Sequence, residues 1–157
     1  MRTAPHAACR WAIALIGAVA ANELLAADPV PAALQGRWVP ASANCESPVR
    51  MEVAASRITL TNGPDSQALG GIEMAGPGYF PPNYRGIEAV LITEFNGQQP
   101  LTVTFNANEK KGVAQADFAP VTPGNQSPQQ KAYNAYISKL NLAKRFPLDK
   151  RPLKKCS

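Results

Sequence analysis

The sequence predicts a mainly β protein, an antiparallel barrel or sandwich of six to eight strands followed by one C-terminal amphipathic helix. Three observations support this fold class. Short segments alternate apolar and polar residues, turn-forming glycines separate them, and a helical repeat of apolar residues occurs near the C-terminus. The alternation is clearest at 49–53 and 101–105, where every second residue is apolar. Such a pattern places one face of a strand on a core and the other in solvent.

The expected strands follow one another at short spacing. Asn62-Gly63 and Asn96-Gly97 can adopt the positive φ angles that tight hairpin turns need, and Gly70-Gly71 indicates a bulge. A loop at 40–48 contains Cys45, and 76–84 is a second loop because it combines proline, glycine and aromatic residues. The segments expected to be strands are 35–39, 49–53, 58–61, 69–74, 87–95, 101–105 and 113–118.

The C-terminal part has a different period. Ser127 is suited to be an N-cap, Pro128 fits the first helical position, and Gln130 completes a capping box. We therefore expect a helix over about 128–143, followed by a basic tail over 144–157. The apolar residues at helical spacing are Tyr133, Tyr136, Ile137 and Leu140.

The N-terminus has the three parts of an export signal. Basic residues without an acid precede an apolar run at 11–21, and small residues end that run. We expect a signal peptide at 1–20, with cleavage as late as residue 27, then a linker at 21–34 and a single β-rich domain at 35–157. The mature protein would be periplasmic or secreted. The alternative is an uncleaved membrane anchor, which would place Glu23 inside the hydrocarbon.

The cysteines agree with export. The chain has three cysteines, and Cys9 lies within the expected signal peptide. Its removal leaves Cys45 and Cys156, an even pair suited to an oxidising compartment. We therefore expect a disulfide between them, and the alternative is two unpaired buried thiols.

Most catalytic chemistries lack their residues. The sole histidine, His6, leaves with the signal peptide, which excludes Ser-His-Asp and Cys-His mechanisms and makes zinc or haem sites improbable. Glu88 and Glu94 share one strand face but stand about 20 Å apart, whereas a glycosidase pair needs about 5–10 Å. We expect no catalytic residues, no metal and no cofactor. A hydrolase that uses carboxylates is the less favoured alternative.

Two segments are candidate binding features. In the aromatic loop, Tyr79, Phe80, Tyr84 and Arg85 are candidate ligand-binding residues at a barrel mouth, where an apolar ligand would need an interior cavity. The alternative is a lid that packs its own rings on the sheet.

The second segment is the basic tail. Residues 128–157 hold eight basic residues and one acid, whereas 21–127 hold six basic residues and ten acids. Such a tail attracts anions or a partner's acidic patch, and export argues against nucleic acid. The alternative is a solvated tail that keeps the protein soluble. The candidate anion- or partner-binding residues are Lys144, Arg145, Lys150, Arg151, Lys154 and Lys155.

Gly36-Arg37-Trp38 gives a G-x-W sequence in the first expected strand. With the short alternating strands and the late helix, it resembles the lipocalin/calycin family. The resemblance implies that Trp38 is a structural residue, which packs across the closed end of an eight-stranded barrel that holds a small apolar ligand. Two features depart from the family: we find six or seven strands, and the downstream T-D-Y motif is absent from the sequence.

Together these observations predict an exported small binding protein of the periplasm or cell exterior. Its partner would be a small apolar ligand or an anionic envelope component, including peripheral contact with a membrane. The alternative is a protein-interaction or inhibitor module of the envelope, similar in size, export and disulfide to bacterial lysozyme inhibitors. The sequence does not predict an oligomeric state.

Overall fold

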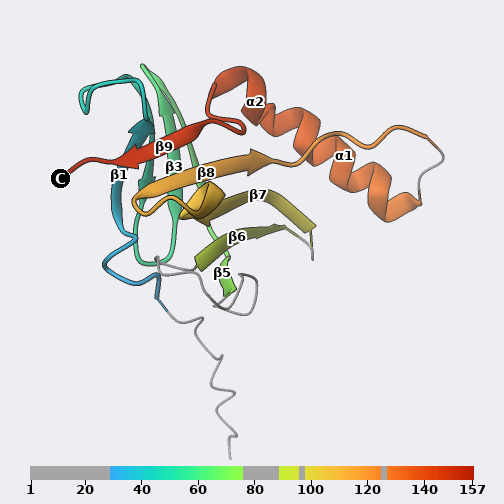
Figure 1. The fold of residues 1–157 in the computed structure, drawn as a ribbon. Coiled ribbons are helices and arrows are strands. Elements are labelled where there is room, and N and C mark those ends of the chain that lie inside the picture. Colours follow the sequence, from blue (N-terminus) through green and yellow to red (C-terminus); the bar gives the residue numbers. More distant parts are fainter. Residues whose placement is uncertain (1–28, 76–88, 96–97, 125–126) are drawn as a thin grey trace, which may run out of the picture.

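The computed structural model describes residues 29–75, 89–95, 98–124 and 127–157 (Figure 1). It confirms the predicted fold class, with nine antiparallel strands in one nearly closed, barrel-like sheet and a C-terminal helix. The elements are β1 (Gly36–Pro40), β2 (Val49–Val53), β3 (Ile58–Asn62), β4 (Asp65–Leu69), β5 (Ile72–Ala75), β6 (Ala89–Phe95), β7 (Gln98–Phe105), the 3₁₀ turn η2 (Ala107–Glu109), β8 (Val113–Phe118), α1 (Pro128–Leu140), α2 (Leu142–Arg145) and β9 (Pro152–Lys155).

The sheet is an up-and-down meander that turns back on itself. Its order is β4-β3-β2-β1-β9-β8-β7-β6-β5, so the last strand lies between the first strand and β8. The two edge strands, β4 and β5, are consecutive in the chain, and only Gly70 and Gly71 separate them. Gly71 has a φ of 63°, which glycine adopts without strain. The predicted strand at 69–74 is therefore two strands, and its expected bulge is the corner where the chain passes from one edge to the other.

The antiparallel order defines two ends of the barrel. The helix end contains the β3–β4 turn, the end of β8 and the start of β9, and α1 and α2 connect these last two strands (Figure 1). The opposite end, which we call the tryptophan end after Trp38 of β1, contains the start of β1, the β2–β3 turn and the start of β8.

Apolar side chains fill the interior of the barrel. The inward-facing Met51, Leu60, Leu91, Val103 and Leu153 are each 0% exposed and belong to one continuous core cluster. This packing follows from the period-two pattern, because alternate residues of each strand point to the same face. The interior cavity that an apolar ligand would need is thus occupied by side chains in the described part of the barrel.

The N-terminal segment packs on the tryptophan end. Val30 and Leu34 are buried in the core, and the Val30 N–H donates to the Ala55 carbonyl in the β2–β3 turn at 2.8 Å. The described part of 21–34 is thus integrated in the domain, which differs from the expected linker. The reason is that these two apolar side chains cover a barrel end that would otherwise be open.

Trp38 lies beneath this segment. It is 3% exposed, and its indole N–H donates to the Leu34 carbonyl at 3.0 Å. Its ring packs edge-on against Phe105 with the ring centroids 5.0 Å apart. The tryptophan thus closes this end of the core while its one polar atom is satisfied.

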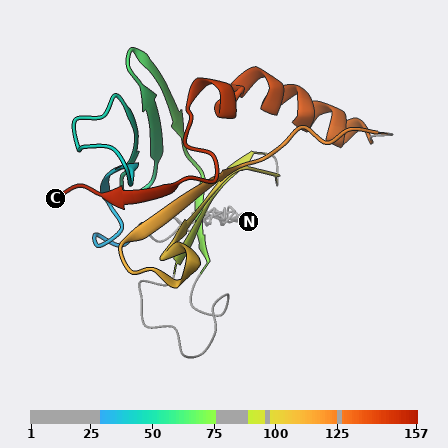
Figure 2. The ribbon, with the colours of Figure 1, turned by 45° about the horizontal axis from the view of Figure 1, so that its top comes forward.

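Helix α1 begins where its capping residues predict. The Ser127 side chain accepts from the Gln130 N–H at 3.1 Å, and Pro128 occupies the first turn. Asn141 then adopts a left-handed conformation with a φ of 46°, which ends α1 and starts the short α2. The expected helix at 128–143 is therefore two helices with a break. In Figure 2, α1 extends sideways beyond the barrel.

The end of the chain is a strand where the sequence suggested a free tail. In β9, Leu153 is 0% exposed, and the strand pairs with β1 and β8. The Cys156 N–H donates to the Arg37 carbonyl at 2.8 Å, and the predicted Cys45–Cys156 disulfide is present. The bridge joins residues 111 positions apart and so attaches the closing strand to the β1–β2 loop.

Candidate functional site

The predicted binding residues fall into an aromatic set and a cationic set, and the structure describes only the cationic set. Tyr79, Phe80, Tyr84 and Arg85 lie outside the described residues, as does the signal peptide at 1–20. The six cations of the C-terminal segment are described, and they do not form one patch.

Arg145 is engaged by the protein itself, which corrects its assignment as a free anion-binding residue. Its guanidinium donates two hydrogen bonds to the Asp65 carboxylate, at 2.6 and 2.9 Å, and a third to the Gln67 side chain at 3.1 Å. The Asn62 amide donates to the Arg145 carbonyl at 2.7 Å. These contacts attach α2 to the β3–β4 hairpin, so Arg145 is a structural clamp.

The five lysines and arginines that remain are divided between the ends of the barrel. Lys144, Lys150 and Arg151 are exposed at the helix end, whereas Lys154 and Lys155 lie on β9 at the tryptophan end. The strand β9 begins at Pro152 at the helix end and ends at Lys155 at the tryptophan end, so its length separates the two sets of cations. The tail therefore carries two separate groups of charge.

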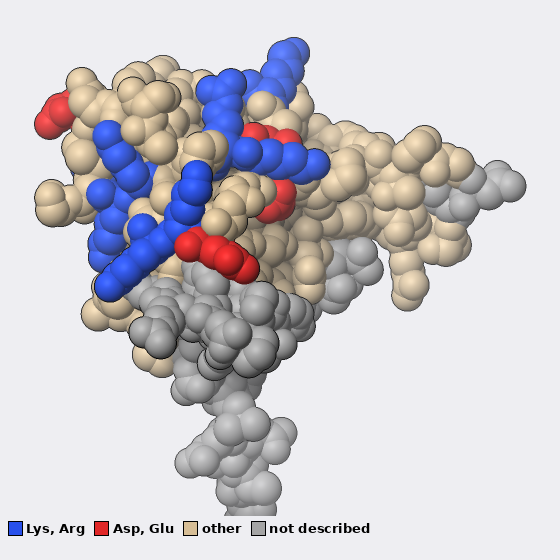
Figure 3. Space-filling model, in the orientation of Figure 1, with Lys and Arg blue, Asp and Glu red and all other residues tan. Residues whose placement is uncertain are grey.

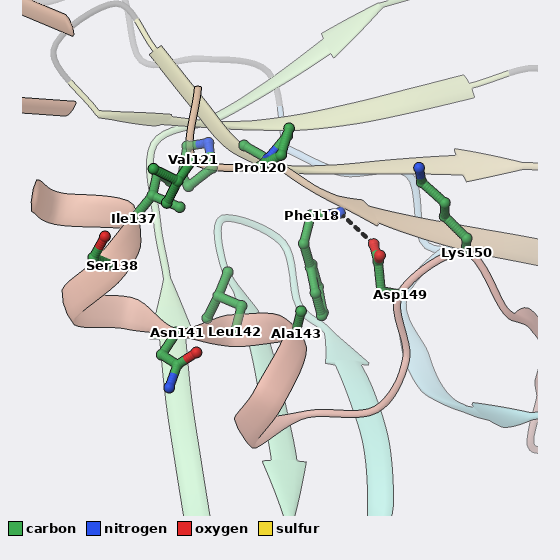
Figure 4. Close-up of a pocket in the computed structure, with 12 residues that line it drawn as sticks. Phe118, Pro120, Val121, Ile137, Ser138, Asn141, Leu142, Ala143, Asp149 and Lys150 are labelled. Atoms are coloured by element: carbon green, nitrogen blue, oxygen red, sulfur yellow. Dashed lines mark hydrogen bonds between the residues drawn. The ribbon is translucent and has the colours of Figure 1, made fainter. Parts of the chain in front are cut away.

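A groove of about 460 Å³ lies at the helix end, outside the barrel (Figure 4). One wall consists of the C-terminal turn of α1 and α2, and the other consists of the end of β8 and the segment that follows it. The residues that line the groove are Pro100, Phe118, Ala119, Pro120, Val121, Ile137, Ser138, Asn141, Leu142, Ala143, Asp149 and Lys150.

Hydrogen bonds donated by two main-chain N–H groups hold the strand wall. The Phe118 N–H donates to the Asp149 carboxylate at 2.8 Å, and the Ala119 N–H donates to the Pro100 carbonyl at 3.1 Å. The Asp149 side chain thus joins the end of β8 to the segment that leads into β9, as the dashed line in Figure 4 shows.

Asn134 connects the two walls. Its side-chain oxygen accepts from the Thr122 N–H at 3.2 Å, and its amide donates to the Thr122 carbonyl at 2.8 Å. This pair of hydrogen bonds fixes the segment after β8 against α1. At the preceding residue of the helix, the Tyr133 hydroxyl donates to the Gln99 carbonyl of β7 at 3.0 Å. Burial raises the pKa of Tyr133 above its usual value, so this phenol stays protonated.

Apolar side chains form much of the floor and walls of the groove, beside a substantial polar surface. Phe118, Ile137 and Leu142 are buried, and in Figure 4 the Phe118 ring and Leu142 project into the space between helix and strand. Val121 is 48% exposed and is the one large apolar side chain classed as exposed within the described ranges. Val121 thus adds one exposed apolar side chain to the lining of the groove.

The polar groups lie along the rim. Ser138 and Asn141 come from the helical wall, while Asp149 and Lys150 come from the turn before β9. Lys150 has a φ of 55°, and its N–H donates to the Ala116 carbonyl at 2.7 Å, which fixes the turn against β8. The adjacent carboxylate and ammonium carry opposite charges, so this part of the rim has no net charge.

The structure describes two strand glutamates that lie far apart in the sheet order. Glu52 lies on β2 and Glu73 on β5, strands that are not neighbours in the sheet, whereas Glu88 and the side chain of Glu94 fall outside the described part. In the described ranges, no three metal-binding side chains come together, and no helix has the length and apolarity needed to cross a membrane.

Sequence reasoning did not find the groove. Its walls come from 118–121 and 137–143. The strand pattern ends at 118, and the helical repeat through 143 indicates residues that pack on a core, so neither pattern predicts a groove. Of the residues that line the groove, only Lys150 was a candidate, as an anion- or partner-binding residue, and that assignment stays a prediction. The one available signal was the run Ala119-Pro120-Val121, because it continues an apolar pattern beyond the end of a strand.

Comparison of the chain with protein-family models, curated proteins and solved structures finds no match. The resemblance of Gly36–Trp38 to lipocalins therefore stays a prediction.

Proposed function

We propose that this protein is an exported binding protein whose groove at the helix end takes a small, uncharged, mainly apolar ligand. The observation that carries the proposal is the groove itself, a partly open space of about 460 Å³ lined by apolar side chains and by several polar groups. Sites for small molecules commonly have volumes of about 300–1,000 Å³, with apolar walls and few polar groups.

The position of the groove explains how a filled barrel can bind a ligand. The core side chains leave the interior occupied, but they also hold β8 rigid, and the hydrogen bonds of Asn134 and Asp149 hold the wall beyond it. A preformed site of this kind loses little conformational entropy when the ligand enters.

The rim supports an uncharged ligand with one hydrogen-bonding end. Ser138 and Asn141 each provide a donor and an acceptor. A ligand carboxylate near Lys150 would also meet the Asp149 carboxylate, so the gain and the repulsion would largely cancel.

Export is the second part of the proposal. The disulfide supports it, because such bridges persist in oxidising compartments such as the periplasm and the cell exterior. The expected signal peptide at 1–20 would direct the chain there.

The test uses N-phenyl-1-naphthylamine, a neutral apolar dye that fluoresces strongly when bound. Ala143 lines the groove, and in Figure 4 it lies opposite the Phe118 ring, so Ala143→Trp should fill the space. We expect saturable dye binding by the native chain and a loss of affinity of at least tenfold in Ala143→Trp. The matched control is Ala132→Trp, at an exposed alanine of α1 outside the groove lining.

Decanol should displace the dye at least as well as decanoate, because the rim carries no net charge. Absence of saturable binding, or equal binding by the Ala143→Trp and native chains, would contradict the proposal. Equal weakening in Ala132→Trp would indicate a general surface effect and would also contradict it.

A further inference from the structure

A recess on the outer face of β1, β2 and β3 lies at the tryptophan end, away from the groove. Its volume is about 440 Å³. Arg37 pairs with Glu52 in the sheet, and Glu52 pairs with Thr59, so these three side chains lie side by side on the outer face. Figure 3 shows lysine and arginine side chains gathered on the side of the molecule where β1 and β9 lie. The residues that line the recess are Gly36, Arg37, Glu52, Val53, Ala54, Arg57 and Thr59.

Two guanidinium groups line this recess, and neither is strongly held. Arg37 Nη2 is 3.6 Å from the Glu52 carboxylate, and its Nη1 donates weakly to the Cys45 carbonyl at 3.4 Å. Arg57 is exposed in the β2–β3 turn, and its side chain makes no hydrogen bond or ion pair with another described residue. Most of the guanidinium N–H donors therefore face solvent in the recess.

Lys155 lies near Gly36 but not on the outer face, because it pairs with the inward-facing Trp38 and lies on the same side of β9 as the buried Leu153. Gly36 has a φ of 123°, and a Cβ at this position would lie 3.1 Å from Lys155 Cε and 3.9 Å from Nζ. The glycine thus leaves room for the lysine side chain to lie across β1. Lys155 donates one hydrogen bond to the Ala33 carbonyl at 2.8 Å.

The one carboxylate does not neutralise the two guanidinium groups. Glu52 also accepts a hydrogen bond from Arg50 at 3.0 Å, so its charge is shared between two arginines. The recess therefore carries two guanidinium groups against one shared carboxylate, which is an excess of positive charge.

We propose that this recess binds a phosphate group, supplied by a soluble phosphate ester or by a lipid headgroup. Guanidinium groups bind phosphate oxygens through paired, charge-assisted N–H donors, and Arg37 and Arg57 both line the recess. The Thr59 hydroxyl, on the same face, offers one more donor.

The test is a titration of the ¹⁵N-labelled native chain with inorganic phosphate at constant ionic strength, followed by NMR. We expect saturable shifts of the amide signals of Gly36, Arg37 and Arg57, and an affinity about tenfold weaker in Arg57→Gln. The control is Arg151→Gln, which removes the same charge from an exposed position at the helix end and should change the affinity less than twofold.

A second arm distinguishes the two sources of phosphate. Co-sedimentation with phosphatidic acid vesicles that inorganic phosphate releases would assign a lipid headgroup, whereas phosphate binding without co-sedimentation would assign a soluble ester. Equal losses in Arg57→Gln and Arg151→Gln, or shifts distributed over the whole surface, would overturn the proposal. Absence of saturable shifts would overturn it as well.

Discussion

The guanidinium of Arg145 and the carboxylate of Asp65 form a two-pronged ion pair with N–O distances of 2.6 and 2.9 Å. The pair joins residues 80 positions apart and connects α2 to the first residue of β4. Asp65 and Gln67 lie on the same face of β4 as the buried Leu69, so at the helix end the inward face becomes polar and receives the arginine. The helix is thereby positioned over its end of the barrel.

This pair predicts a pH-dependent contribution to stability. The hydrogen bonds from Arg145 hold the pKa of Asp65 below its ordinary value of 3.8. A carboxyl whose pKa is lower in the folded state stabilises the protein above its unfolded pKa, and this contribution is lost as the pH falls through the folded pKa. We expect Asp65→Asn to lower the Tm by about 1–4 °C at pH 7, because the pair is partly exposed. The difference should shrink as the pH falls below 3.8 and disappear below the lowered pKa of Asp65, as thermal unfolding followed by circular dichroism would show.

Asp117→Asn is the matched control for this experiment. Among the described residues, the Asp117 carboxylate contacts the Gln115 amide at 3.3 and 3.4 Å and forms no ion pair. Its replacement should leave the pH dependence of the Tm almost unchanged. An Asp65→Asn chain with the native Tm at pH 7 would show that the clamp adds nothing to stability.

The disulfide gives a second prediction, which also tests export. Replacing both Cys45 and Cys156 with serine should lower the free energy of unfolding by about 2–5 kcal/mol, because the bridge closes a long loop of the unfolded chain. Urea unfolding of the native and double-serine chains measures the difference. Reductant should destabilise only the native chain.

The location of bridge formation is measured by mass spectrometry after thiol alkylation. We expect the bridge in chains expressed with residues 1–20 and collected outside the cytoplasm, and free thiols in chains expressed in the cytoplasm without them. Native unfolding that does not respond to reductant would contradict the stabilising role. Free thiols in the exported chain would contradict the oxidising location.

The two strands that the sequence missed explain the limits of the fold prediction. β4 begins Asp65-Ser66-Gln67-Ala68, and its inward positions near the helix end bind Arg145, so the apolar alternation is absent there. β9 is four residues long and contains a proline and two lysines, with Leu153 as its only buried side chain. Its strand conformation depends on pairing with β1 and β8, which no local pattern records.

The candidate sites depended even more on distant contacts. The charge of the C-terminal segment was evident, but Asp65 removes Arg145 from it, and β9 carries Lys154 and Lys155 to the opposite end. Arg37 and Arg57, from the first part of the chain, lie at this same end of the barrel. Composition predicts that such cations exist, whereas only the sheet order determines which of them share a surface.

The final prediction concerns the wall of the groove. Asn134 is 7% exposed, and its two hydrogen bonds to Thr122 hold the segment after β8 against α1. Asn134→Ala removes both, so we expect a loss of about 1–3 kcal/mol in the free energy of unfolding. We also expect faster hydrogen exchange at the Thr122 amide and weaker binding of N-phenyl-1-naphthylamine, because a mobile wall no longer preforms the site.

A comparable loss of stability elsewhere in the same helix provides the control. Ser127→Ala removes the N-cap of α1, which accepts from the Gln130 N–H, and should cost about 1 kcal/mol. Its change lies at the far end of the helix from the groove, so dye affinity and Thr122 exchange should remain close to native. If Ser127→Ala weakened dye binding as much as Asn134→Ala, the loss would follow the stability of the helix, and the Asn134–Thr122 contact would have no separate role in preforming the groove.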